Sequence, residues 1–143
     1  MMLRGLIAGC IIGLPGALWA QTAAEEARTT RSGVYTAAQA TRGSELYALN
    51  CASCHSAATH ASPAFAAKWA GHPLAELFQY MNQEMPKENP GSLSAKEYTL
   101  LLAYMLKMNG MPAGRSELSS DPVELEKIKI DLKPMRDSSS RQP

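Results

Sequence analysis

The feature that most constrains this chain is the run Cys51-Ala52-Ser53-Cys54-His55. Two thiols three positions apart can bond to two carbons on one side of a porphyrin, and the next residue can then turn its imidazole toward the iron. Covalent attachment keeps such a group in place even where the surrounding core is small. The run therefore predicts one haem c, attached at Cys51 and Cys54, with His55 as an iron ligand.

Two other chemistries share the Cys-x-x-Cys spacing. A thioredoxin-like redox pair normally lies at a strand-to-helix junction, whereas here a helical pattern leads into the motif. A zinc site would have to combine the two cysteines with His60 or His72, and these spacings match no common zinc pattern. Both remain alternatives at this point, and the sequence favours haem.

The first 20 residues predict an export signal. Arg4 gives a short basic start, the apolar run that follows is about 15 residues long, and Leu18-Trp19-Ala20 resembles a signal-peptidase site. We expect cleavage after Ala20 and a periplasmic location. An uncleaved membrane anchor is disfavoured because a spanning helix needs about 20 apolar residues. Lipid attachment at Cys10 is disfavoured because the apolar run continues well past that cysteine.

Length and charge narrow the class of protein. The 143 residues suit one domain, and 14 Lys+Arg against 13 Asp+Glu give a net charge of +1 without a basic cluster. Nucleic-acid binding is therefore not expected. We predict a signal peptide over residues 1–20, a flexible lead-in over 21–32, one folded haem-binding domain over 33–115 and a C-terminal extension over 116–143, partly docked and then mobile.

The sequence predicts an all-α fold with three main helices and no convincing strand pair. Thr36 and Gln39 have capping-box spacing, so the first helix should run from about residue 37 to 51. Gly43 within it suggests that another backbone approaches closely there. Residues 56–67 look like a loop, in which Pro63 ends any local turn.

The other two main helices are predicted from prolines and from a second capping box. Pro73 suits the first position of the second, and two prolines make residues 85–93 irregular. Ser94 and Glu97 form another capping box, which opens a helix that ends near residues 109–110. Asp121-Pro122 suggests a short helix, after which Ile128 and Ile130 dock on the main body.

At this point the chain resembles the small bacterial class I c-type cytochromes, with one haem and His/Met ligation, over about residues 33–131. The matching segments are Gly33–Thr36 with Gln39, Arg42-Gly43, Leu46-Tyr47, Cys51–His55, Met85-Pro86, Pro90–Ser94 with Glu97-Tyr98, Asn109-Gly110 and Pro112–Gly114. The resemblance implies a cytochrome c-like fold around one covalently attached haem. It is closest to members found beside periplasmic quinoprotein and other dehydrogenases.

Met85 is the predicted sixth ligand. It follows the second main helix and precedes the proline-rich loop, which frees its side chain to face the iron from the side opposite His55. Met81 and Met105 lie on apolar helix stripes and suit core positions. His60 is too close to His55 in sequence to reach the opposite face easily; Met81, His72 and an open site remain alternatives. In the family that the chain resembles, the methionine before the proline is the ligand.

Neighbours of the haem are also expected. The resemblance implies that the carbonyl of Pro63 accepts a hydrogen bond from the His55 ring, which fixes its orientation. Trp69 either donates its indole N–H to a haem propionate or is simply packed. Three apolar side chains should keep water from the ring, and two tyrosines should lie where the first and third main helices cross. The apolar side chains are Phe65, Leu77 and Phe78, and the tyrosines are Tyr47 and Tyr98.

Two filled axial positions leave no room for substrate on iron, so we expect an electron carrier and not an enzyme. Its partners would be redox proteins, among them a periplasmic quinoprotein or other dehydrogenase, and no stable membrane insertion is expected after signal cleavage. One alternative is a small cytochrome subunit of a dehydrogenase complex, docked through residues 116–133. A gas-binding haem protein with an open sixth position is the other.

Overall fold

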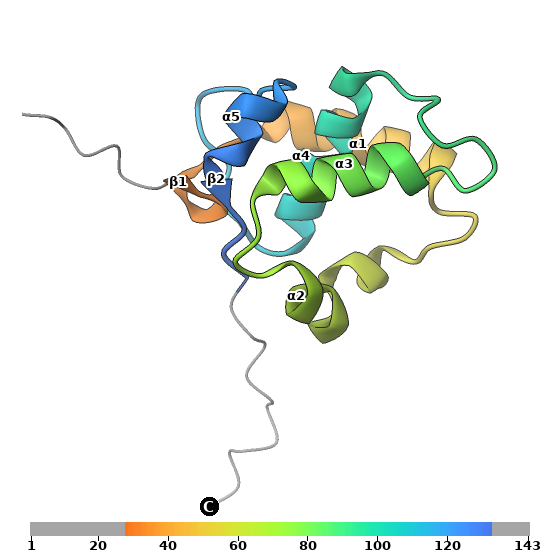
Figure 1. Cartoon of the computed structure of the whole chain (residues 1–143), viewed down its shortest axis with the longest axis horizontal. Coiled ribbons are helices and arrows are strands. Elements are labelled where there is room, and N and C mark those ends of the chain that lie inside the picture. The colour runs from red at the N-terminus through yellow and green to blue at the C-terminus, as the bar shows by residue number, and fades with distance from the viewer. Residues whose placement is uncertain (1–27, 133–143) are drawn as a thin grey trace, which may run out of the picture.

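The computed structural model describes residues 28–132 (Figure 1). The predicted signal peptide, residues 21–27 of the predicted lead-in and the tail from residue 133 lie outside this range. Within it the fold is all-α, as predicted, apart from two short strands. The helices are α1 (Ala37–Asn50), α2 (Pro63–Trp69), α3 (Leu74–Glu84), α4 (Ala95–Met108) and α5 (Pro122–Glu126), and the strands are β1 (Arg28–Thr29) and β2 (Ile128–Lys129). No helix in this part of the chain is long and apolar enough to cross a bilayer.

Helices α1 and α4 form the central packed pair. Both predicted capping boxes are present, with Thr36 and Gln39 at α1 and with Ser94 and Glu97 at α4. A Cβ atom at Gly43 would collide with the backbone carbonyl of Leu100. The expected close approach is therefore confirmed, and a side chain at this position would push the two helices apart.

Helix α2 was not predicted. The hydroxyl of Ser62 accepts a hydrogen bond from the N–H of Phe65, and Pro63 takes the first helical position, where its missing N–H costs nothing. Pro63 thus opens a helix and does not end a turn. Residues Ala57–Ala61 before it form a 3-10 helix with no buried residue. The expectation of a loop over 56–67 is wrong for these residues. Pro73 caps α3, which begins one residue later than expected.

The segment 116–132, here called the strap, returns along the body of the protein. As predicted, Asp121 caps the short helix α5, and Ile128 and Ile130 are buried. Leu125 within α5 is 0% exposed, and α5 packs on α3. The strap therefore supports α3 from the outside.

The strap also contacts the N-terminal end of the described chain and the segment before α3. Strand β2 pairs in parallel with β1, with Arg28 opposite Ile128 (Figure 1). The N–H of Ile130 donates to the carbonyl of His72 at 2.9 Å. This pairing differs from the expectation of no strand pair and of a flexible lead-in through residue 32. It joins residues about a hundred positions apart, which local sequence signals do not report.

Candidate haem-binding site

A cavity of about 330 Å³ opens beside the end of α1. Its lining includes Cys51, Cys54, His55, Met85 and Trp69, so the structure brings together five of the six predicted site residues. Pro63, the sixth, is not among the lining residues. Much of the remaining surface is apolar and comes from Phe65, Leu77, Met81, Leu93, Leu101 and Met105. Phe78, also expected to shield the ring, is buried behind this lining against Tyr98.

One side of the cavity, here called the motif wall, consists of residues 50–60. Helix α1 ends at Asn50, and the N–H of the capping residue Cys51 still donates to the carbonyl of Tyr47 at 2.9 Å. The chain then turns back, so that the N–H of His55 donates to the carbonyl of Cys51 at 2.9 Å. This turn places both cysteines and the histidine along one side of the cavity.

The burial of Cys51 disfavours a redox pair. It raises the pKa of the Cys51 thiol. Thiols that exchange disulfides are instead found where the pKa is lowered, which favours the reactive thiolate. The zinc alternative also lacks support, because residues 28–132 contain no group of three or more His, Cys, Asp or Glu side chains arranged to hold a metal ion.

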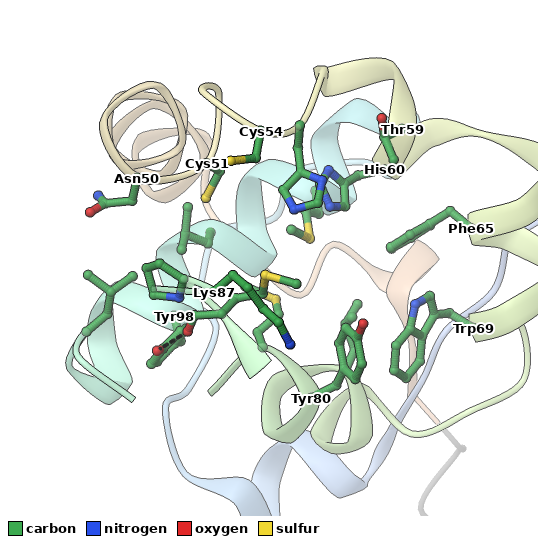
Figure 2. Close-up of a pocket in the computed structure, with 18 of the residues that line it drawn as sticks. Asn50, Cys51, Cys54, Thr59, His60, Phe65, Trp69, Tyr80, Lys87 and Tyr98 are labelled. Carbon is green, nitrogen blue, oxygen red and sulfur yellow. Dashed lines mark hydrogen bonds between the residues drawn. The ribbon is translucent and has the colours of Figure 1, made fainter. Parts of the chain in front are cut away.

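The side of the cavity formed by α3, the residue that follows it and α4, here called the methionine wall, contributes Met81, Met85, Tyr98, Leu101 and Met105. Figure 2 shows Tyr98 across the cavity from Cys51 and Cys54. Met85 ends α3: its N–H donates to the carbonyl of Met81 at 2.9 Å, and its own carbonyl accepts from the Tyr98 hydroxyl at 2.7 Å. Met85 is thereby held beside Tyr98 on this wall.

The two tyrosines expected at the crossing of α1 and α4 have different places. Tyr47 lies there, with its ring 5.4 Å from that of Tyr104 on α4. Tyr98 instead packs against Phe78 of α3, and its hydroxyl bonds to Met85. Its contact is with the end of α3, which the spacing of residues within α4 does not indicate.

His60 was not predicted as a neighbour of the His55 ring. The two ring centroids lie 5.1 Å apart in an edge-on arrangement. The Tyr47 hydroxyl lies 3.1 Å from Nδ1 of His60 and donates to the carbonyl of His55 at 3.2 Å. Burial lowers the pKa of His60, and charge on His55 lowers it further. His60 therefore packs beside His55, and its position five residues on in the same loop was the available signal.

The predicted role of Pro63 gains no support from this arrangement. Pro63 is the first residue of α2, where its carbonyl is placed to accept a hydrogen bond within the helix. No residue between 28 and 132 accepts a hydrogen bond from the His55 ring.

Trp69 forms the end of the cavity that Figure 2 shows beside Phe65 and Tyr80. It is 7% exposed, and its ring centroid lies 5.4 Å from that of Tyr80. The Lys68 ammonium covers the same pair, 3.9 Å from the Tyr80 centroid. Packing of Trp69 is thus shown. His72 does not line the cavity and pairs with Glu76 at 2.7 Å.

These donors fit a haem c. Two thiols, an imidazole and a thioether line one cavity, and much of its remaining lining is apolar. A soft sulfur ligand and an imidazole are donors that haem iron accepts. The apolar surface would keep water from the ring, as an electron-transfer site requires.

The comparisons with known proteins agree with this chemistry. Residues 38–105, from the start of α1 into α4, match the family model described as cytochrome C oxidase, cbb3-type, subunit III. No curated protein and no solved structure matches the chain. The matched segment contains the whole Cys51–His55 motif and Met85. The motif, the helical fold around the cavity and this match together support a c-type cytochrome.

Proposed function

We propose that this protein is a periplasmic carrier of single electrons with one haem c, attached at Cys51 and Cys54 and ligated by His55 and Met85. A haem-based electron carrier is what a cytochrome c domain implies. The single haem rests on the sequence, because it contains one Cys-x-x-Cys-His motif and only one further cysteine. We also propose that the cytochrome domain spans residues 33–115 and that 116–143 form an extension.

The observation that supports this proposal is that His55 and Met85, which come from different segments of the chain, line one cavity. His55 follows the cysteines on the motif wall, and Met85 is fixed to the methionine wall by Tyr98. With both residues as ligands, the iron of a bound haem would have no position left for a substrate. The bound haem supplies a one-electron couple, and a thioether ligand raises its reduction potential.

The protein's own residues would keep the haem able to take up and release an electron. The motif wall fixes the imidazole, the methionine wall fixes the thioether, and the apolar lining excludes water. Cys54 is exposed and Leu49, nearby at the end of α1, is 81% exposed, so a partner can approach the motif wall closely. Such contacts suit a small, transient interface with a redox protein. A periplasmic quinoprotein or other dehydrogenase is the proposed donor.

The proposed location rests on the export signal over residues 1–20. Removal of this segment takes away one arginine and no acid, which leaves 13 basic and 13 acidic residues. We therefore expect no strong electrostatic steering toward a partner. The mass of the exported protein should correspond to a chain that begins at Gln21. A chain that retains residues 1–20 or carries lipid at Cys10 would contradict this.

A second function is favoured by the matched family, whose description names an oxidase subunit. In that case the chain would be a small subunit of an oxidase or dehydrogenase complex, docked through the strap. Val123 on α5 is 64% exposed and offers an apolar contact there. Size-exclusion of native extracts separates the two functions: a free carrier elutes at the size of one small protein, and a subunit elutes with its complex.

Spectroscopy of the haem-loaded protein tests the ligand pair. The oxidised protein should show the weak near-infrared band of a methionine–iron bond, and Met85→Ala should abolish the band and lower the midpoint potential. Met105→Leu is the matched control, since Met105 lines the same wall but is predicted to be a core residue. Loss of the band in Met105→Leu, or its retention in Met85→Ala, would refute the assignment.

A further inference from the structure

We propose that Tyr98 is a positioning residue for the sixth ligand, whose hydroxyl holds the backbone of Met85 so that the thioether stays directed into the cavity. This inference rests on the proposed His55/Met85 ligation. It concerns how strongly the protein itself, apart from the iron–sulfur bond, keeps Met85 in place.

Tyr98 is a fixed point in the structure. It is 0% exposed and lies in the first turn of α4, directly after the Ser94–Glu97 capping box. Its ring packs edge-on against Phe78 of α3 with the centroids 6.2 Å apart. Helix α4 is in turn packed on α1 around Gly43. The Tyr98 hydroxyl therefore cannot shift without moving the central helix pair.

Met85 depends on this hydroxyl because it lies where regular structure ends. Its backbone is extended, its N–H still bonds back to Met81 of α3, and the next residue, Pro86, has no N–H to donate. The carbonyl of Met85 is outside the helix and accepts from Tyr98 at 2.7 Å (Figure 2). Two hydrogen bonds, one to each backbone polar group, thus fix the peptide units on both sides of the Met85 side chain.

His55, on the motif wall, does not need such a hydrogen bond to hold its backbone in place. The Tyr47 hydroxyl bonds to the carbonyl of His55 at 3.2 Å, but His55 directly follows a cysteine through which the haem would be attached. The covalent link would hold His55 near the iron without that bond. Met85 has no such link, so the hydrogen bond from Tyr98 is what holds it to α4, beside the bond of its own N–H to Met81 of α3.

Competition with imidazole measures how firmly the hydrogen bond from Tyr98 holds Met85 in place. In the haem-loaded ferric protein, added imidazole displaces the methionine, and loss of the near-infrared band gives its apparent affinity. A hydrogen bond of ordinary strength predicts that Tyr98→Phe binds imidazole about two- to tenfold more tightly than the wild type. Tyr104→Phe is the matched control, because it removes a hydroxyl from the same helix that is not bonded to Met85, and it should leave the affinity unchanged.

General destabilisation is tested separately. Leu102→Val removes part of a fully buried side chain of α4 that does not line the cavity, so it should lower the melting temperature and leave the imidazole affinity unchanged. If Tyr98→Phe binds imidazole no more tightly than Tyr104→Phe, or if Leu102→Val matches Tyr98→Phe, the positioning role is refuted. A wild type without the near-infrared band would refute the proposed ligation as well, whereas a normal band with unchanged Tyr98→Phe affinity refutes the positioning role alone.

Discussion

The two walls of the cavity are built in different ways. On the motif wall, Cys54 is exposed, and the 3-10 helix Ala57–Ala61 buries none of its residues. On the methionine wall, Met81, Tyr98, Leu101 and Met105 are all buried. The motif wall would be bonded covalently to the haem, so it needs little packing of its own. The methionine wall would hold the iron only through a thioether, so it needs a rigid core behind it.

The largest effect should follow from removing the covalent link. Replacing both Cys51 and Cys54 with serine leaves only coordination to hold the haem, so the exported chain should lose most of it. Intact mass under denaturing conditions measures the attached group. Ser53→Ala, between the two cysteines, is the control and should retain one haem per chain. Retention of covalent haem by the double serine variant would show that the motif wall is not the attachment site.

The support behind the methionine wall can be weakened from the strap. Leu125 is 0% exposed on α5, which packs on α3, and Leu125→Ala should lower the free energy of unfolding by about 2–5 kcal/mol. On heating, the near-infrared band should disappear at a lower temperature than in the wild type, while the haem stays attached. Val123→Ala on the exposed side of α5 should change neither. An unchanged melting temperature in Leu125→Ala would mean that the strap does not stabilise this wall.

The two walls meet through the crossing of α1 and α4. Gly43→Ala would place a methyl group against the carbonyl of Leu100, which should cost about 1–3 kcal/mol. In a helix without this contact the same change would stabilise the protein by about 1 kcal/mol, so the sign is diagnostic. Denaturant unfolding measures it, with Thr41→Ala on the exposed face of α1 as control. A stabilised Gly43→Ala variant would contradict the close crossing.

The smallest effect concerns the start of α4. The N–H and hydroxyl of Ser94 both donate to the Glu97 carboxylate at 2.7 Å and lower its pKa below the ordinary value of 4.5. A lowered pKa in the folded state means that Glu97 stabilises the protein above about pH 4.5 and that this contribution is lost as the pH falls through the lower value. Denaturant unfolding of Glu97→Gln should therefore differ from the wild type at pH 7 and converge with it in acid. Glu45→Gln on the surface of α1 serves as the control, and a difference for Glu97→Gln that persists in acid would exclude this origin.

The sequence predicted those parts of the fold that depend on neighbouring residues. The capping pairs at Thr36 and Ser94 marked the starts of α1 and α4 because each pair lies within one helical turn. Helix α2 was missed because Pro63 was interpreted as a breaker, although proline is also suited to a first helical position. The β1–β2 pairing was missed because nothing local connects Arg28 with Ile128.

The candidate site divides in the same way. The attachment residues and His55 follow from a five-residue motif, and Met85 follows from its place before a proline-rich loop. The contact of His60 with His55 and the bond from Tyr98 to Met85 depend on how the loop folds and how α4 packs on α3. Such contacts between elements carry no signal at fixed spacing, so only the three-dimensional structure revealed them.

The central claim, that iron is held between the two walls by His55 and Met85, is tested most directly by NMR of the reduced, haem-loaded protein with isotope-labelled methionine methyl groups. The account predicts that one methyl signal is shifted strongly by the ring current of the porphyrin. This signal should be absent in Met85→Leu and present in Met81→Leu and Met105→Leu. A wild-type spectrum without such a signal, or a signal that disappears with Met81 or Met105 and survives in Met85→Leu, would contradict it.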